Sequence, residues 1–290
     1  MYPSAFEYKV PETLEEALTM LAEVGEEGRV LAGGQSLIPM MKLRLASPAF
    51  LIDINGLDGL GSIESANGYI SVGALVRHND IVNSDLISSE SHTMASAAPW
   101  IADPLVRNRG TLCGSVAHCD PEGDWNSVML AMRSEVVVRS LTGERVVPID
   151  DFVVDFFTNS LQPGEMVTEV RIPKYTGRAG GAYMKLERKV GDYATAAVAI
   201  HLQLDDAGRI AQAGIALTAV NSINTRAVDA ENALVGETPS EQLFAEAASL
   251  AAQASDPEDN IRGPADYKRN IIEVYTKRSL ATALEIAQAS

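Results

Sequence analysis

Two glycine-rich segments carry the residues with the most definite chemistry in this sequence. The first glycine segment is Ala32-Gly33-Gly34-Gln35-Ser36, and the second glycine segment is Thr111-Leu112-Cys113-Gly114-Ser115. Glycine leaves the main chain open to a ligand, exposed N–H groups favour anionic oxygens, and Ser or Thr hydroxyls add hydrogen-bond donors. One such segment would be read as a simple chain reversal between a strand and a helix. Two of them favour a pyrophosphate group bound between them.

The common nucleotide-binding fingerprints are absent from both segments. Neither segment contains G-x-G-x-x-G with an acidic residue about 20 positions later, and neither contains G-x-x-x-x-G-K-[ST]. A Rossmann site for NAD and a P-loop are therefore both disfavoured, and a different dinucleotide-binding architecture is expected.

No metal site and no catalytic residue is predicted on this chain. His118, Cys119 and Asp120 are consecutive, and consecutive residues rarely point at one ion. The sequence offers neither a Ser-His-Asp arrangement nor an activating partner for a reactive cysteine.

A strand, a glycine turn and a helix are predicted around the first segment. Residues 30–31 have the pattern of a short buried strand, and residues 38–45 have that of a helix. Before them, residues 11–24 form an amphipathic helix that opens with Thr13 and Glu16 at capping-box spacing. Short β-type segments at 50–54 and 69–73 complete a mixed α and β first half.

The second segment is expected to be a loop reached from a helix of small residues at 90–100, through residues 107–110. An apolar helix is predicted after it at 125–132. Strands at 136–139 and 145–148 flank a turn and predict a hairpin.

Residues 172–181 are rich in Pro, Gly and polar residues and are the best candidate for a domain boundary. Apolar β-type runs follow at 194–204 and 210–220, and the rest has the period and alanine content of helices. This composition predicts a compact second domain of the α+β kind. Three helices are expected in this second domain, at residues 225–234, 240–254 and 264–287.

Composition excludes several classes of partner. The chain has 290 residues, and 23 Lys plus Arg against 39 Asp plus Glu give a net charge of -16, which repels nucleic acid and anionic bilayers. No signal peptide is recognisable and no apolar run is long enough to span a membrane, so a cytoplasmic location is expected. The two cysteines, Cys113 and Cys119, are expected to be free thiols. They are too few for an iron–sulfur cluster, which must lie on another chain.

The sequence around both segments closely resembles the FAD-binding medium subunit of molybdenum hydroxylases, the carbon monoxide dehydrogenase and xanthine dehydrogenase family. Residues 30–44 resemble its first FAD loop, and residues 109–118 with Asp120-Pro121 and Asp124 resemble its second. One departure is Cys113, which stands where the family usually has the first glycine of Thr-x-Gly-Gly, and it raises the question whether this position needs a glycine-only conformation. Further matching stretches extend to the end of the chain at 73–78, 188–194 and 262–269.

The resemblance implies an α+β fold in two domains. The first is a two-part FAD-binding domain of the vanillyl-alcohol-oxidase/PCMH type at 1–175, with subdomains at about 1–55 and 56–175. The second, at 176–290, is a small α+β domain with a short antiparallel sheet and three helices.

The resemblance also implies which residues contact FAD. Asp124 would bind the flavin's sugar chain, with a helix N-cap as the alternative. Lys185 would lie near the flavin and stabilise negative charge on the reduced ring, with a solvated strand lysine as the alternative. Tyr193 would cover the isoalloxazine, with a core tyrosine as the alternative, and Ile101 and Val167 would pack on the cofactor or simply belong to the core. The residues expected to wrap the pyrophosphate and ribityl chain are Leu31, Ala32, Gly33, Gly34, Gln35, Ser36, Leu37, Ile38, Thr111, Cys113, Gly114 and Ser115.

In function, the resemblance implies an FAD subunit that passes electrons from iron–sulfur clusters of a partner to an external acceptor. The expected partners are a large subunit with the molybdenum cofactor and a small subunit with [2Fe-2S] clusters, assembled as a dimer of heterotrimers. Two alternatives remain open, a self-sufficient FAD-dependent oxidase or dehydrogenase and a flavin-free assembly module. The substrate would be selected on the large subunit and cannot be read from this chain.

Overall fold

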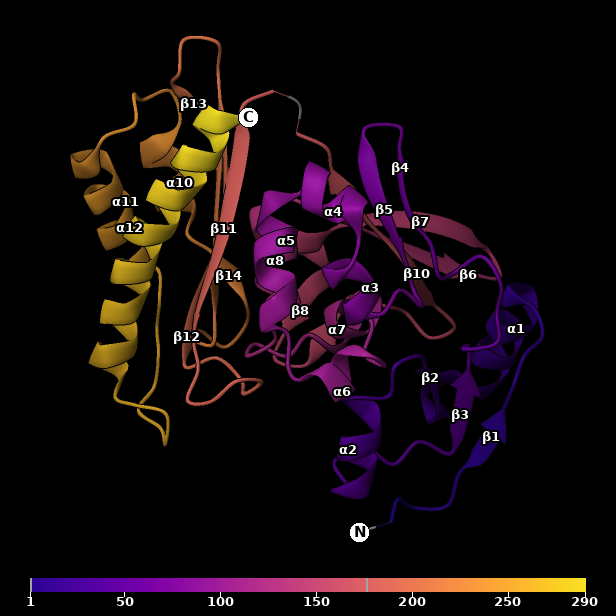
Figure 1. Cartoon of the computed structure of the whole chain (residues 1–290). Helices are drawn as coiled ribbons and strands as arrows, with labels where there is room; N and C mark the ends of the chain where they lie inside the picture. Colours follow the sequence, from indigo (N-terminus) through magenta and orange to yellow (C-terminus); the bar gives the residue numbers. More distant parts are fainter. Residues whose placement is uncertain (1, 176) are drawn as a thin grey trace.

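The structure, a computed structural model, describes residues 2–175 and 177–290. The chain starts with a three-stranded parallel sheet in the order β1-β3-β2, formed by β1 (Glu7–Lys9), β2 (Gly28–Leu31) and β3 (Phe50–Asp53) (Figure 1). Parallel neighbours need crossover connections. Here α1 (Leu14–Val24) and α2 (Leu37–Lys42) lie in them, and a short 3-10 turn, η1 (Gly25–Glu27), precedes β2.

The amphipathic helix predicted at 11–24 is present as α1. The Thr13 side chain caps it by accepting a hydrogen bond from the Glu16 N–H at 3.1 Å. Ala17, Leu18 and Leu21 lie on one helical face and are buried in the core. The cap and the apolar spacing therefore fix both the start of α1 and the face that it buries.

A five-stranded antiparallel sheet follows, in the order β4-β5-β10-β6-β7. The predicted hairpin is confirmed, because β6 (Glu135–Ser140) and β7 (Gly143–Pro148) are paired neighbours. The other strands are β4 (Ile63–Ala66), β5 (Tyr69–Gly73) and β10 (Met166–Pro173).

Helices and short turns fill the connection between β5 and β6 and the one between β7 and β10. The single helix predicted at 90–100 is divided into α5 and the 3-10 turn η2, because Pro99 lacks the N–H that an α-helix needs. The elements in these connections are α3 (His78–Val82), α4 (Asp85–Glu90), α5 (His92–Ala97), η2 (Ala98–Trp100), α6 (Pro104–Arg107), α7 (Leu112–His118), α8 (Asp124–Ala131), α9 (Ile149–Phe152), β8 (Val153–Asp155) and β9 (Thr158–Asn159).

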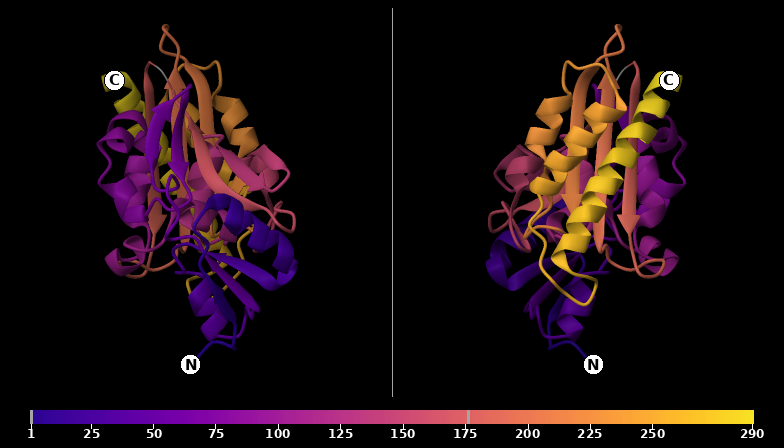
Figure 2. Two further views of the ribbon diagram at one scale, coloured as in Figure 1. Left: turned by 90° about the vertical axis from the view of Figure 1, so that its right-hand side faces the viewer. Right: turned by 90° about the vertical axis from the view of Figure 1, so that its left-hand side faces the viewer.

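The C-terminal part is a four-stranded antiparallel sheet in the order β11-β12-β13-β14. One face is covered by α10 (Val228–Leu234), α11 (Glu241–Gln253) and α12 (Ala265–Ala289), and the other packs on α5 and α8 (Figures 1 and 2). The predicted α+β C-terminal domain with three helices is confirmed. Its strands are β11 (Ala179–Leu186), β12 (Ala196–Leu204), β13 (Ile210–Thr218) and β14 (Thr225–Arg226).

Strand β12 shows why this sheet can be covered on both faces. Ala197 and Ala199 belong to the core shared with the first domain, whereas Val198 and Ile200 belong to the core under the helices. Successive side chains of a strand point to opposite faces, so small residues alternate with larger ones. The alanines let α5 and α8 approach the sheet closely.

One sequence expectation needs correction in this region. The helix predicted at 225–234 begins only at Val228, because Thr225–Arg226 pair with β13 as β14. The stretch at 172–181, predicted as a boundary, is partly strand, since β10 ends at Pro173 and β11 begins at Ala179. Residue 176 in this stretch lies outside the described residues, and the division at 175/176 stays a prediction.

A glycine on β13 sets the distance between the two domains. A Cβ atom on Gly214 would lie 1.8 Å from the Ala131 carbonyl oxygen, at the end of α8. We therefore expect Gly214→Ala to lower the free energy of unfolding by about 1–3 kcal/mol through overpacking. Urea denaturation of Gly61→Ala gives the matched control, because a Cβ on Gly61 meets no atom within 4 Å. Equal stability of the two variants would contradict this close packing.

Candidate functional site

The first glycine segment joins β2 to α2. It lies directly against Arg109 and Gly110, the two residues that precede the second segment. A Cβ on Gly33 would lie 2.4 Å from the Arg109 carbonyl oxygen and 2.7 Å from the Gly110 Cα. Gly34 has a φ of 71°, in the left-handed region that side chains rarely adopt. The first segment is thus in main-chain contact with the two residues that directly precede the second, a proximity that the sequence only suggested.

Main-chain donors are available in the first segment. In residues 2–175 and 177–290, the N–H groups of Gly34, Gln35 and Ser36 have no main-chain carbonyl partner. Gln35 is exposed and the flanking Ser36 is half-buried. Unpaired N–H groups at an accessible turn suit an anionic oxygen.

The second glycine segment is the start of α7, and the prediction of a loop there was wrong. Thr111 is the N-cap residue, and its hydroxyl accepts a hydrogen bond from the Gly114 N–H at 3.0 Å. A Cβ on Gly114 would lie 2.7 Å from that hydroxyl, so glycine leaves room for the cap. Cys113 and Ser115 lie in the first turn of this helix. A Thr cap followed by small residues resembles a turn in sequence, because both use the same residue types.

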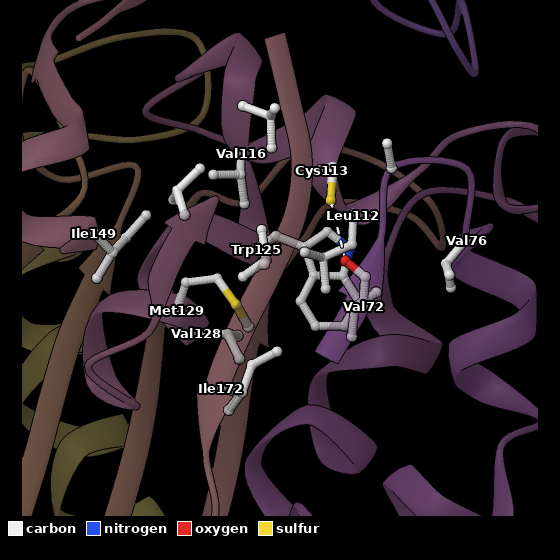
Figure 3. Close-up of a cluster of buried hydrophobic side chains, with 14 of the residues drawn as sticks. Val72, Val76, Leu112, Cys113, Val116, Trp125, Val128, Met129, Ile149 and Ile172 are labelled. Atoms are coloured by element: carbon white, nitrogen blue, oxygen red, sulfur yellow. Dashed lines mark hydrogen bonds between the residues drawn. The ribbon is translucent and has the colours of Figure 1, made fainter. Parts of the chain in front are cut away.

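Cys113 requires no glycine-only conformation. It lies within α7, and its Sγ is 3.4 Å from the Val72 carbonyl oxygen in the apolar core shown in Figure 3. Burial raises the pKa of the Cys113 thiol, and burial also raises the pKa of Cys119 to about 12. Both thiols are free and buried, and both stay protonated at neutral pH.

Two side chains that sequence reasoning missed brace the glycine segments together. Asn55 Nδ2 donates to the Ala32 carbonyl oxygen at 2.9 Å, and Arg77 donates to Asn55 Oδ1. Arg77 Nη1 also donates to the Arg109 carbonyl oxygen at 2.6 Å. Hydrogen bonds therefore connect Ala32 of the first segment to Arg109, which precedes the second segment. The available signal was that Arg77 lies in the matched stretch at 73–78.

His78 fixes Gly110, which also precedes the second segment, from the core side. The main-chain N–H of His78 donates to the Gly110 carbonyl oxygen at 2.9 Å, and the imidazole Nδ1 accepts from Trp125 Nε1 at 3.0 Å. Burial, together with the positive charges of Arg107 and Arg77, lowers the pKa of His78 to about 4. The imidazole is therefore neutral, as an acceptor at Nδ1 requires.

Asp124 lies at the start of α8 but does not cap it. The N-cap position belongs to Gly123, and the buried carboxylate turns towards β11. Its Oδ1 accepts from the Tyr183 hydroxyl at 2.5 Å and its Oδ2 from Lys185 Nζ at 3.0 Å. The N-cap alternative was wrong, because β11 offers the carboxylate two buried donors.

Lys185 is buried, so the alternative of a solvated lysine was also wrong. Its side chain is 1% exposed, and its Nζ donates to the Trp100 carbonyl oxygen at 3.1 Å as well as to Asp124. The carboxylate of Glu187 lies 3.6 Å from the same Nζ. Burial raises the pKa of Asp124, and the adjacent Lys185 opposes that rise. This cluster contains two carboxylates and one ammonium group.

Tyr193 lies in the connection between β11 and β12 and is 47% exposed, so the core-tyrosine alternative was wrong. The guanidinium carbon of Arg262 is 5.7 Å from the centre of its ring, and Arg262 forms an ion pair with Glu122. Burial of the hydroxyl and the nearby Asp120 raise the pKa of Tyr193 to about 12. Loops of both domains therefore meet around this tyrosine.

Ile101 and Val167 are buried core residues. Ile101 follows η2, next to the carbonyl that accepts from Lys185, and its own carbonyl accepts from Arg107 at 2.9 Å. Val167 lies on β10. Their contact with a cofactor stays a prediction.

Comparison with known proteins decides the family. The family model described as the FAD binding domain in molybdopterin dehydrogenase matches residues 4–175, and the CO dehydrogenase flavoprotein C-terminal domain matches residues 181–283. The chain belongs to the FAD-binding medium subunits of the molybdenum hydroxylases. Members of this family are subunits of oxidoreductases. The resemblance noted from the two glycine segments is confirmed.

Two relatives of this medium subunit match it over nearly its whole length. The 6-hydroxypseudooxynicotine dehydrogenase complex subunit alpha of Paenarthrobacter nicotinovorans is 38% identical, covering 99% of this chain and 97% of that protein. The carbon monoxide dehydrogenase medium chain of Hydrogenophaga pseudoflava is 36% identical, covering 98% of each.

Solved structures agree with these sequence relatives. The carbon monoxide dehydrogenase from Hydrogenophaga pseudoflava that lacks the Mo-pyranopterin moiety superposes with a TM-score of 0.94 and 38% identity, covering 98% of this chain and 99% of that one. The reconstituted enzyme from Oligotropha carboxidovorans gives a TM-score of 0.95 and 33% identity, covering 99% and 100%.

Two features are absent from the described part of this medium subunit. Within it, no helix combines the length and apolar character needed to cross a membrane. The same residues contain no group of three or more His, Cys, Asp or Glu arranged to hold a metal ion.

The helical conformation of Cys113 gives a direct test. We expect Cys113→Gly to lower the free energy of unfolding by roughly 1–2 kcal/mol, because glycine is a poor helix former and leaves the thiol's core space empty. Cys113→Ala separates the two causes, since it removes the thiol but keeps the helix propensity. Urea denaturation measures both. A more stable Cys113→Gly protein would show that the position prefers a glycine conformation after all.

Proposed function

We propose that this chain binds FAD between its two glycine segments and passes electrons from iron–sulfur clusters of a partner subunit to an external acceptor. The observation that carries the proposal is the main-chain contact of Gly33 with Arg109 and Gly110. It brings the free N–H groups of the first segment close to the residues that lead into the second, in a chain whose residues 4–175 match the FAD-binding family model and whose residues 181–283 match the C-terminal one.

The residues present suit a pyrophosphate. Its oxygens would accept from the N–H groups of Gly34, Gln35 and Ser36 and from hydroxyls of the second segment. Burial and the charge of Arg109 lower the pKa of Arg77, and the carboxylates of Asp80 and Asp53 oppose that shift. Arg77 and Arg109 both contribute positive charge beside the segments. This local positive charge favours an anion on a chain whose net charge is -16.

The buried cluster suits the flavin end of the cofactor. Asp124 would accept hydrogen bonds from hydroxyls of the flavin's sugar chain, because each carboxylate oxygen can accept more than one. Lys185 would act mainly by holding that carboxylate, since its ammonium group is already bound to Asp124 and to the Trp100 carbonyl oxygen. Tyr193 would cover the isoalloxazine through its exposed ring, and Ile101 and Val167 would pack against the cofactor.

Bound FAD supplies one-electron and two-electron chemistry, which suits a position between an iron–sulfur cluster and an acceptor. The relatives include the medium chain of a carbon monoxide dehydrogenase, the medium subunit of a nicotine 6-hydroxylase and subunit alpha of a dehydrogenase complex. We propose the same organisation here, with a large molybdenum subunit, a small [2Fe-2S] subunit and a dimer of heterotrimers in the cytoplasm.

A self-sufficient oxidase or dehydrogenase is less well supported. Such an enzyme needs an acid or base free to act over the flavin. In the described residues, the buried side chains of Tyr183 and Lys185 both donate hydrogen bonds to Asp124. This arrangement supports binding of a cofactor more than proton transfer to a substrate.

The proposal is tested by FAD titration of the full chain, alone and with its copurifying subunits. We expect uptake of FAD, seen as flavin absorbance, without hydroxylase activity of the chain alone. Gly33→Ala should weaken FAD binding at least about tenfold, because its Cβ would push the segments apart. Gly61→Ala should bind like wild type. Failure of the wild-type chain to take up FAD in both preparations would refute the proposal, and would leave the flavin-free assembly module.

A further inference from the structure

Tyr183 joins the two domains at the predicted cofactor site, and neither the sequence motifs nor the family comparison assigns it a role. It lies on β11, is 3% exposed, and donates its hydroxyl hydrogen to Asp124 Oδ1 at 2.5 Å. Asp124 falls in the region matched by the FAD-binding family model, and Tyr183 falls in the region matched by the C-terminal one. The bond therefore crosses from one domain to the other.

Asp124 is held at both oxygens by neighbouring positions of one strand. Tyr183 and Lys185 are two residues apart on β11, so their side chains lie on the same face of the sheet. Tyr183 bonds to Oδ1 and Lys185 bonds to Oδ2. Because a donor holds each oxygen, the Asp124 carboxylate can adopt only one orientation. Each oxygen still has a lone pair that can accept a hydrogen bond from a further donor.

The main chain at Asp124 is fixed separately from its carboxylate. Ser127 donates to the Asp124 carbonyl oxygen at 2.9 Å, and Thr218 on β13 donates to the Ser127 hydroxyl at 2.6 Å. His78 holds Trp125, the next residue of α8. Loss of the Tyr183 hydroxyl should therefore disturb the carboxylate while α8 keeps its place.

We propose that Tyr183 is a positioning residue for FAD, holding the Asp124 carboxylate in the orientation that accepts a hydroxyl of the cofactor's sugar chain. This proposal rests on the function proposed above. It also makes docking of the C-terminal domain a condition for tight cofactor binding, because the positioning hydroxyl comes from β11.

The charges around Asp124 add a pH signature. Burial and the charge of Glu187 raise its pKa, whereas Lys185 and the Tyr183 hydroxyl lower it, and Tyr193 faces it from the adjacent loop. Removal of the Tyr183 hydroxyl takes away one of the two lowering contributions, so the pKa rises further. More of the carboxyl group is then protonated as the pH falls, and FAD affinity should fall with it.

The experiment compares FAD dissociation constants of the full chain at pH 6, 7 and 8, with its copurifying subunits present. We expect Tyr183→Phe to raise the constant about tenfold at pH 8, the loss of one hydrogen bond to a charged group, and to raise it further at pH 6. The control is Tyr175→Phe, which also removes a tyrosine hydroxyl bond, in that case to the Met132 carbonyl oxygen at 2.8 Å. The control should stay within about twofold of wild type at every pH.

Asp124→Asn keeps the test decisive if Tyr183→Phe does not fold. The amide cannot titrate, so the FAD affinity of Asp124→Asn should be low and independent of pH. Where Tyr183→Phe does fold, adding it to Asp124→Asn should lower the affinity little further. Wild-type affinity in a folded Tyr183→Phe protein, or in Asp124→Asn, overturns the role of Tyr183. Absence of FAD binding by wild type overturns the proposed function instead.

Discussion

Close contact between main chains, at positions that lack a side chain, is the constraint on which this structure depends. At Gly33, the turn between β2 and α2 packs against the residues that precede α7. At Gly214, β13 packs against the end of α8. A methyl group at either place would lie within 2.4 Å of a carbonyl oxygen, far inside van der Waals contact. The first contact aligns the two glycine segments. The second sets how near the C-terminal sheet comes to the cluster around Asp124.

The Asp124–Lys185 ion pair then specifies how the domains meet. A buried pair gains little net stability, because desolvation of both charges offsets their attraction. Removal of one partner is costly, about 3–5 kcal/mol, because it leaves a buried charge alone. Any other docking of β11 on α8 would separate Lys185 from Asp124 and leave the Asp124 carboxylate without its cation, whereas Lys185 would keep Glu187 nearby. The pair therefore disfavours misdocked arrangements more than it stabilises the correct one, and this suits a site that needs both domains.

Sequence reasoning succeeded where the signal is local. The cap at Thr13 with the apolar spacing of α1, the β6–β7 hairpin and the apolar strand β12 all follow from patterns within about ten residues. The glycine segments carried enough specific sequence to identify the family. Sequence reasoning failed where two local structures use the same residue types. At Thr111, the residues of a helix cap resemble those of a glycine turn.

The rest of the site could not be predicted, because its partners are distant in sequence. Arg77 and Asn55 are 22 residues apart, and Tyr183 and Asp124 are 59 apart. No periodicity links such pairs, and each of these side chains has an ordinary surface role by composition alone. Lys185 is the clearest case, since a lysine is almost never fully buried unless it is paired. Only the fold brings Asp124 to it.

The same geometry explains how an acidic chain can hold an anionic cofactor. Over the whole surface the charge of -16 repels anions, but a field falls off within about 10 Å at ordinary ionic strength. Near the glycine segments the guanidinium groups of Arg77 and Arg109 and the partial charges of N–H groups supply positive charge, and the carboxylates of Asp53 and Asp80 partly offset it. Arg77 also hydrogen-bonds to the Arg109 carbonyl, so it braces the segments and contributes charge at once. Shape and local charge at the site therefore depend on the same side chain, and a neutral residue in place of Arg77 would disturb both.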